Sequence, residues 1–142
     1  MRLVRYSCNS KESVGVISGD TVIDIPLSLA HMPRTIRGIL EGGASHLAEI
    51  QQLVDQQAEG ISLSEVELKA PIPDPQKYLA IGMNYQDHAE EAAAKGGPIP
   101  KTQLWFNKQV SCITGPFDPI VYPRVSDKLD YEAELGVVIG KR

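Results

Sequence analysis

The chain has 142 residues, 42% of them apolar and 23% charged, and its 14 basic and 18 acidic side chains give a formal net charge of -4. These values exclude a disordered, collagenous or coiled-coil chain and indicate one globular domain or two small ones. The acidic balance, without a basic stripe, argues against nucleic acid or an anionic membrane as a partner. No apolar run approaches the roughly 20 residues of a membrane span, and no secretory signal is evident, so we expect a cytoplasmic protein.

Residues 1–70 are predicted to form a small N-terminal α/β domain. The β-prone run at residues 2–6 predicts a first strand. Two further β-prone runs, at residues 13–17 and 21–25, flank Gly19 and predict a hairpin.

Helical spacing of apolar residues follows in the same domain. Residues 36–40 predict a short helix that ends at two glycines. A second amphipathic helix is predicted to be capped by Ser45 and ended by Gly60. The alternating run at residues 61–68 predicts a closing strand.

Residues 71–142 are predicted to form the second part of an α+β chain, mostly β with one helix. Eight of the ten prolines fall between residues 71 and 123, and the first three of these mark an extended linker. Residues 77–82 predict a buried strand, and a helix is predicted to begin at Asn84 and to end at Gly96. Three more β-prone runs follow, at residues 103–108, 119–123 and 131–140.

An acidic pattern opens the last of these runs. In a strand, Asp130, Glu132 and Glu134 share one face. One interpretation is an edge strand whose acidic face meets water; another is a cation site, favoured because the apolar Val138 lies on the same face. Oxygen ligands without a nearby Cys or His favour Mg²⁺, Mn²⁺ or Ca²⁺ over zinc.

A second pattern lies on the predicted helix. His88 and Glu91 are three residues apart, so the carboxylate can accept the imidazole N–H and make the histidine a general base for water. The alternative is a solvated helix, since Glu91 also stands four residues before Lys95. Lys108 suits an anionic substrate or extends from a strand edge into water.

Four segments in register carry a resemblance. They are IGMNYQDHAEE, QLWFNK, GPFDPIVYP and DYEAELGVVIGKR. In this order and at these separations they resemble the fumarylacetoacetate hydrolase family over residues 77–142. The opening residues are similar to the small N-terminal domain of bacterial members.

The resemblance implies a metal-dependent enzyme that cleaves a C–C bond in a 1,3-diketo acid, such as an acylpyruvate or a fumarylacetoacetate-like substrate. Glu132 and Glu134 match the family's metal ligands for Mg²⁺ or Mn²⁺, and His88 with Glu91 match its water-activating pair. Lys108 falls in a block that contacts substrate. The implied fold is a mixed, β-rich roll, usually homodimeric, with the helix of His88 as a lid.

The chain departs from the family pattern at its C-terminal end. Eight residues follow Glu134, fewer than separate it from the family's third metal ligand, an aspartate. We therefore expect a chain truncated within the catalytic domain. The alternatives to C–C hydrolysis are another reaction of the family, such as isomerisation, decarboxylation or ureidoglycolate lysis, and a truncated, non-catalytic module that binds a partner or an organic acid.

Overall fold

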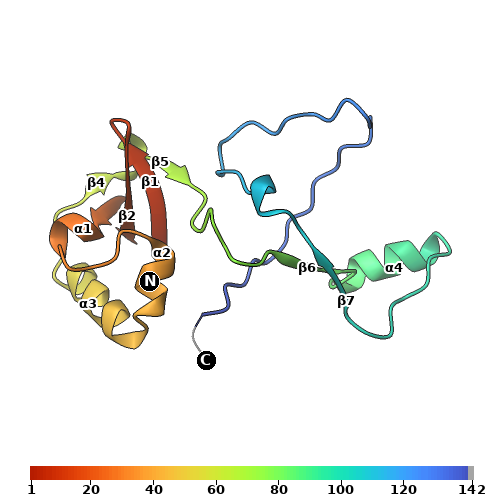
Figure 1. Ribbon diagram of the computed structural model, residues 1–142, viewed down its shortest axis with the longest axis horizontal. Helices are drawn as coiled ribbons and strands as arrows, with labels where there is room; N and C mark the ends of the chain where they lie inside the picture. The colour runs from red at the N-terminus through yellow and green to blue at the C-terminus, as the bar shows by residue number, and fades with distance from the viewer. Residues whose placement is uncertain (141–142) are drawn as a thin grey trace. The chain divides into compact units, whose positions relative to one another are not determined.

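The computed structural model describes residues 1–140, and its contacts divide them into two compact units (Figure 1). One unit holds residues 1–72 together with 114–140, and the other holds residues 73–113. Within these 140 residues, no helix combines the length and apolar content that a membrane crossing requires. Units defined by contacts need not fold independently, so the split predicted at residue 70 stays a prediction.

The first unit is built on an antiparallel sheet of five strands in the order β4-β3-β2-β1-β5. The elements in chain order are β1 (Leu3–Cys8), β2 (Lys11–Ser18), β3 (Thr21–Asp24), α1 (Ile25–Ser28), α2 (Ile36–Glu41), α3 (Ala44–Asp55), β4 (Ile61–Ser62), the 3₁₀ turn η1 (Leu63–Glu65) and β5 (Glu67–Lys69). The predicted first strand, hairpin and two helices are confirmed, whereas α1 was not predicted.

Tight turns set the register of the sheet. Asn9 and Ser10 both have positive φ, 49° and 63°, as the turn of a type I′ hairpin requires, and they join β1 to β2 with Cys8 opposite Lys11. Gly19, with φ of 57°, joins β2 to β3. The single strand predicted at residues 61–68 is wrong, because η1 splits this run into β4 and β5, which pair with opposite edges of the sheet.

The ends of α3 differ from the prediction. Gly43 occupies the N-cap with φ of 66° and ψ of -145°, a conformation that only glycine adopts readily, and Ser45 instead donates its hydroxyl to the carbonyl of Gly42 at 3.2 Å. The helix ends at Asp55, before Gly60, and the left-handed Gln57, with φ of 52°, follows its C-cap Gln56. The predicted cap at Ser45 and the predicted end at Gly60 are both wrong, because the backbone conformation of the flanking chain, and not the capping preference of a residue, determines where α3 starts and ends.

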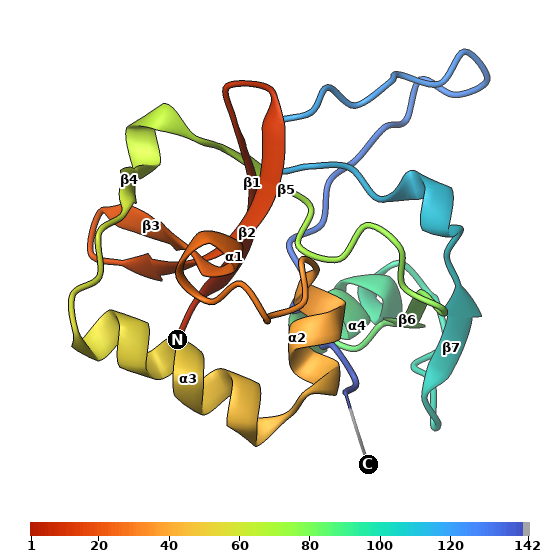
Figure 2. The ribbon, with the colours of Figure 1, turned by 60° about the vertical axis from the view of Figure 1, so that its left-hand side comes forward.

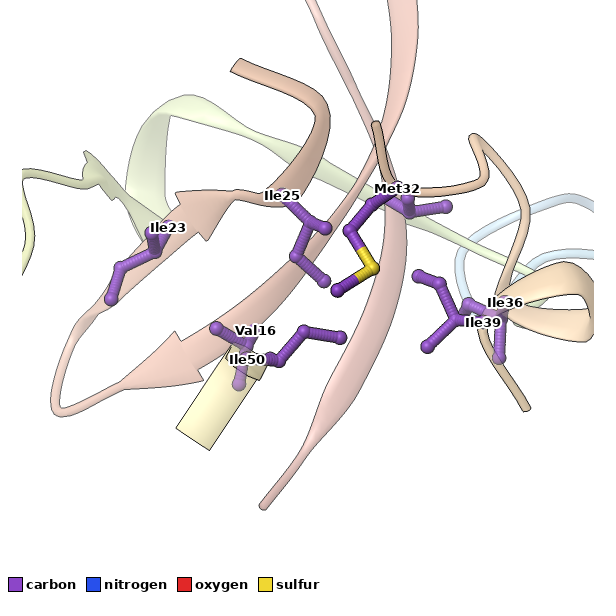
Figure 3. Packing of buried hydrophobic residues seen from close by; sticks show 8 residues of the cluster. Val16, Ile23, Ile25, Met32, Ile36, Ile39 and Ile50 are labelled. Atoms are coloured by element: carbon purple, nitrogen blue, oxygen red, sulfur yellow. The ribbon is translucent and has the colours of Figure 1, made fainter. Parts of the chain in front are cut away.

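Apolar side chains from the sheet and helices form one core. Figure 2 shows α3 running along the sheet beneath β2 and β3, and Figure 3 shows the side chains converging between these layers. The cluster consists of Val14, Val16, Ile23, Ile25, Met32, Ile36, Ile39 and Ile50, all buried. Burial of a large aliphatic side chain contributes about 1.5–3 kcal/mol, so this cluster is the main source of stability in the first unit.

A buried tyrosine ties β1 to the start of α1. The Tyr6 hydroxyl donates to Oδ2 of Asp24 at 2.6 Å, and the backbone N–H of Leu27 donates to Oδ1 of the same carboxylate at 2.7 Å. The Tyr6 ring is 2% exposed and lies over Gly15, where an added Cβ would stand 3.3 Å from the ring. One half-buried carboxylate therefore satisfies both a buried hydroxyl and a helix end.

The second unit is smaller and lacks a core of its own among the described residues. It contains β6 (Leu79–Gly82), α4 (Gln86–Ala94), β7 (Leu104–Asn107) and the 3₁₀ turn η2 (Val110–Cys112), with β6 and β7 paired antiparallel. The predicted strands at residues 77–82 and 103–108 and the helix between them are confirmed. The burial predicted for residues 77–82 is wrong, since Leu79 is 49% exposed.

The last two predicted strands do not form. Residues 119–123 and 130–140 carry no regular structure, and Val137 and Ile139 are 72% and 88% exposed. A strand needs hydrogen-bonding groups from a neighbouring strand, and within residues 1–140 no strand pairs with either segment.

Candidate functional site

The helix α4 positions His88. It begins after Tyr85, which takes an extended conformation as N-cap without a side-chain capping bond, so the cap predicted at Asn84 is wrong. No residue of α4 is buried, and His88 is exposed. The imidazole is therefore open to water and to small molecules.

The predicted glycine stop of α4 is confirmed. Gly96 is left-handed, with φ of 84°, and donates its N–H to the carbonyl of Ala93 at 2.9 Å. Gly97 donates to the carbonyl of Ala92 at 2.8 Å. These two bonds form a Schellman motif, which satisfies carbonyls that the helix end would leave without partners.

The predicted base pair lies on this helix. His88 and Glu91 stand one turn apart on α4, and both are exposed. The neighbouring carboxylate of Glu90 accepts a hydrogen bond from Nε2 of Gln86 at 2.7 Å, which engages it along the helix. The pairing of His88 with Glu91 that the three-residue spacing predicts stays a prediction.

Lys108 follows β7 directly. Its backbone N–H donates to the carbonyl of Tyr78 at 2.8 Å, which extends the pairing of β6 with β7 by one bond. Its ammonium group lies 5.8 Å from the centroid of the Phe106 ring, within the range of a cation–π contact. The half-buried stem and the contact with the ring hold this cation close to the two-stranded sheet.

A cleft of about 230 Å³ lies in the same unit, between the end of β6 and the segment before β7. Its walls include Met83, Asn84, Lys101, Thr102 and Gln103. No pattern in the sequence predicts this cleft. The sequence does contain a lysine followed by two side chains that can form hydrogen bonds, Lys101, Thr102 and Gln103. Sequence periodicity does not predict the reversal of the chain between α4 and β7 that forms the cleft.

The acidic pair lies in the irregular segment of the first unit. Glu132 and Glu134 are both exposed, and the N–H of Tyr131 turns back to Oδ1 of Asp130 at 2.9 Å. The shared strand face predicted for these carboxylates is therefore not formed, because the strand itself is absent.

The carboxylates of Glu132 and Glu134 can be compared with the ligands that divalent cations prefer. Two carboxylates are ligands that hard cations prefer, and Mg²⁺ often takes one or two carboxylates while water or substrate fills its other positions. Within the described residues, no group of three His, Cys, Asp or Glu side chains is arranged to hold a metal. Glu132 and Glu134 thus fit part of a coordination shell.

Both cysteines, Cys8 and Cys112, are free thiols.

Comparison with known proteins identifies related sequences along the whole chain. The family described as fumarylacetoacetate (FAA) hydrolase C-terminal matches residues 77–142. A mitochondrial oxaloacetate tautomerase of Xenopus laevis is 38% identical and covers 100% of this chain, which aligns with 45% of that protein. A mitochondrial oxaloacetate tautomerase of Bos taurus is 37% identical, with 100% of this chain and 46% of the relative aligned. The chain spans about half the length of the relatives that it matches.

Solved structures share the fold. Maleylpyruvate hydrolase from Sphingobium sp. SYK-6, solved in complex with manganese(II) and pyruvate, is 28% identical and superposes with a TM-score of 0.64 over 88% of this chain and 43% of its own. This likeness confirms the predicted α+β class.

The family match begins at residue 77, four residues before the first motif segment, and it includes all four segments, the helix of His88 and the acidic segment. The cytoplasmic location stays a prediction, since both tautomerases are mitochondrial. The dimer also stays a prediction. The agreement of motif order, family match and fold assigns residues 77–142 of this chain to the fumarylacetoacetate hydrolase family.

Proposed function

We propose that the chain belongs to a metal-dependent enzyme that hydrolyses a C–C bond in a 1,3-diketo acid. The observation that carries the proposal is the family match over residues 77–142, within which His88 and Glu91 occupy one turn of an exposed helix. A base for water must be reachable by both water and substrate, and the exposure of α4 meets that requirement.

His88 and Glu91 form the proposed base pair. The Glu91 carboxylate accepts the N–H of one imidazole nitrogen, which leaves the other nitrogen with a lone pair to take a proton from water. The hydroxide equivalent then attacks the carbonyl next to the bond that breaks, and the departing carbon leaves as an enolate.

Glu132 and Glu134 are the proposed protein ligands for Mg²⁺ or Mn²⁺, with Ca²⁺ as a further candidate. A bound divalent cation would supply positive charge that stabilises the enolate oxygen. The manganese(II) in the maleylpyruvate hydrolase of Sphingobium supports the choice of metal. The two carboxylates serve here to hold the cation, with substrate oxygens expected to occupy other positions.

Lys108 is the proposed cation on the substrate side. Its contact with Phe106 lowers the freedom of the side chain, and a positive charge there favours an anionic keto acid. The helix α4 has nine residues, fewer than the roughly 12–15 that an isolated helix needs in water, so contact with substrate would stabilise it as a lid.

A second reaction is favoured by the relatives. The proteins of Xenopus laevis and Bos taurus are oxaloacetate tautomerases, which points to keto–enol isomerisation as the alternative. The same base could serve, because tautomerisation also moves a proton at a carbon next to a carbonyl. The two reactions differ in outcome, since only hydrolysis breaks a C–C bond.

One experiment tests the proposal and separates the two reactions. The full-length enzyme to which the chain belongs is incubated with an acylpyruvate and with enol oxaloacetate, with Mn²⁺ or with EDTA, and the enol absorbance and the release of pyruvate are followed together. Hydrolysis predicts Mn²⁺-dependent pyruvate release from the acylpyruvate, whereas tautomerisation predicts loss of the enol band without a new acid.

Variants test the residue assignments. His88→Ala and Glu132→Gln should each lower the rate by about a hundredfold or more, the usual range for loss of a general base or of metal-held charge. His31→Gln, on the exposed surface of the first unit, is the matched control and should retain the rate. No metal-dependent reaction with either substrate would refute the function, and full activity of His88→Ala would refute the site.

A further inference from the structure

The helix that carries the proposed base is not held in place by burial. None of the residues of α4, from Gln86 to Ala94, is buried. A helix of a globular protein is ordinarily held by the packing of an apolar face against a neighbouring element. The direction of α4, and with it the place of His88, therefore depends on the segments that join the helix to β6 and β7.

The segment from β6 to α4 is short and contains one unusual backbone conformation. Gly82 ends β6 and Gln86 begins α4, so residues 83–85 form the whole connection. Tyr85 is extended, with φ of -102° and ψ of 134°. Among residues 83–85, all of which the structure describes, Met83 alone has a positive φ, of 53°. Because three residues offer few rotatable bonds, the sign of φ at Met83 strongly affects the direction in which α4 leaves β6.

This conformation is unfavourable for methionine and needs support from its surroundings. In the left-handed region the Cβ of an L-residue comes close to the following carbonyl oxygen. The half-buried Met83 lies in the wall of the cleft together with Pro100 and Lys101, which belong to the segment that returns to β7. The pairing of Gly82 with Leu104 fixes the residue just before it. Strained residues persist where the surrounding structure holds them, and they cluster at functional sites.

We propose that Met83 is a positioning residue for the proposed base. Its left-handed backbone sets the direction of α4 relative to the β6–β7 sheet, and thereby the place of His88. The role of His88 as a base rests on the proposed function, whereas the direction of α4 does not. A general base must lie within hydrogen-bond reach of its water, so a helix that left the sheet in another direction would carry His88 out of reach.

Two isomeric substitutions test the direction of α4. Leucine and isoleucine have the same atoms and apolar character, but only isoleucine is branched at Cβ, which makes the left-handed region especially unfavourable. Residual dipolar couplings of the backbone N–H groups are measured in the ¹⁵N-labelled chain without metal or substrate, and they report the orientation of α4 relative to β6 and β7. Met83→Leu should keep the couplings of residues 86–94, whereas Met83→Ile should change them because φ at this position becomes negative.

Two further variants complete the set. Leu104→Ile places a β-branched residue in β7, where such residues are favoured, at a side chain that is 54% exposed, so the couplings of α4 should stay as in the parent. Met83→Gly removes the side chain from the cleft wall and allows φ of both signs. In that variant α4 should sample several directions, so its couplings should shrink while those of β6 and β7 are kept.

The activity of the full-length enzyme to which the chain belongs tests the link to the base. Met83→Ile should lower kcat by about a hundredfold, as expected for a displaced catalytic group, and should leave KM nearly unchanged because the base does not bind substrate in the ground state. Met83→Leu should retain the parent kcat.

Unchanged couplings of α4 in Met83→Ile would overturn the inference, as would an equal change in Met83→Leu. Where Met83→Ile loses the couplings of β6 and β7 as well, unchanged couplings of α4 in Met83→Gly would overturn it. A higher KM with the parent kcat would refute the link to His88. Because the couplings are recorded without substrate, an enzyme that reacts with neither substrate would refute the proposed function, while the couplings still decide the direction of α4.

Discussion

Replacing Asp24 by alanine should destabilise the first unit more than loss of a helix cap alone. The carboxylate accepts the hydroxyl of Tyr6 at 2.6 Å and the N–H of Leu27 at 2.7 Å. Losing an N-cap costs about 1 kcal/mol, and leaving a buried hydroxyl without its charged acceptor costs about 2 kcal/mol. We therefore expect Asp24→Ala to lower the free energy of unfolding by about 3 kcal/mol.

The assay is urea unfolding followed by the methyl NMR signals of Val16 and Ile50, which report on the core of the first unit. Thr35→Ala is the matched control, because Thr35 caps α2 through its hydroxyl without holding a buried group, and it should cost about 1 kcal/mol. In a Tyr6→Phe background, where only the cap remains to be lost, Asp24→Ala should cost about 1 kcal/mol, roughly a third of its cost in the parent. A cost no larger than that of Thr35→Ala, or one unaffected by Tyr6→Phe, would refute the reasoning.

Three further outcomes are expected. Gly15→Ala should destabilise the first unit by about 2 kcal/mol in the same assay, since its Cβ would collide with Val22 and lie 2.8 Å from the carbonyl oxygen of Ile23; an effect below about 0.5 kcal/mol would contradict the packing. Gln57→Gly should raise stability by about 0.5 kcal/mol by relieving the left-handed conformation, whereas a loss would mean that the side chain matters more. Burial and the bond to Asp24 raise the pKa of Tyr6 above 10.0, so stability should be constant below about pH 10 and fall above it, and less steeply in Tyr6→Phe; equal slopes in urea titrations at alkaline pH would argue against this.

Helices, whose hydrogen bonds are internal, could be predicted from the sequence, but the residues that cap the starts of α3 and α4 could not. The apolar spacing located α2, α3 and α4, and the two glycines after α4 predicted its end. Ser45 and Asn84 have good capping side chains, yet Gly43 and Tyr85 hold those positions. The φ and ψ angles at a helix start depend on how the preceding chain approaches, which residue preference does not encode.

The candidate site residues depend on backbone geometry to different degrees. The types and spacing of His88 and Glu91 predict a base pair, and the structure bears out the helix on which that spacing depends, since α4 contains both residues. The same reasoning identified Glu132 and Glu134, but their shared face requires a strand, and a strand takes its hydrogen bonds from a neighbour.

The proposed base pair and the proposed metal ligands thus differ in whether the backbone that carries them is regular. The proposed base pair stands on a helix whose backbone bonds and Schellman stop lie within residues 86–97, so the backbone that carries it is ordered without ligand. The carboxylate pair lies on irregular backbone in the described residues, so a cation must bring both groups together and fix several φ and ψ angles as it binds. Metal affinity therefore depends on whatever pairs with residues 130–140, whereas the basicity of His88 does not. Substitutions that favour extended backbone at Ala133 should then raise metal affinity while leaving the pH profile of the base unchanged.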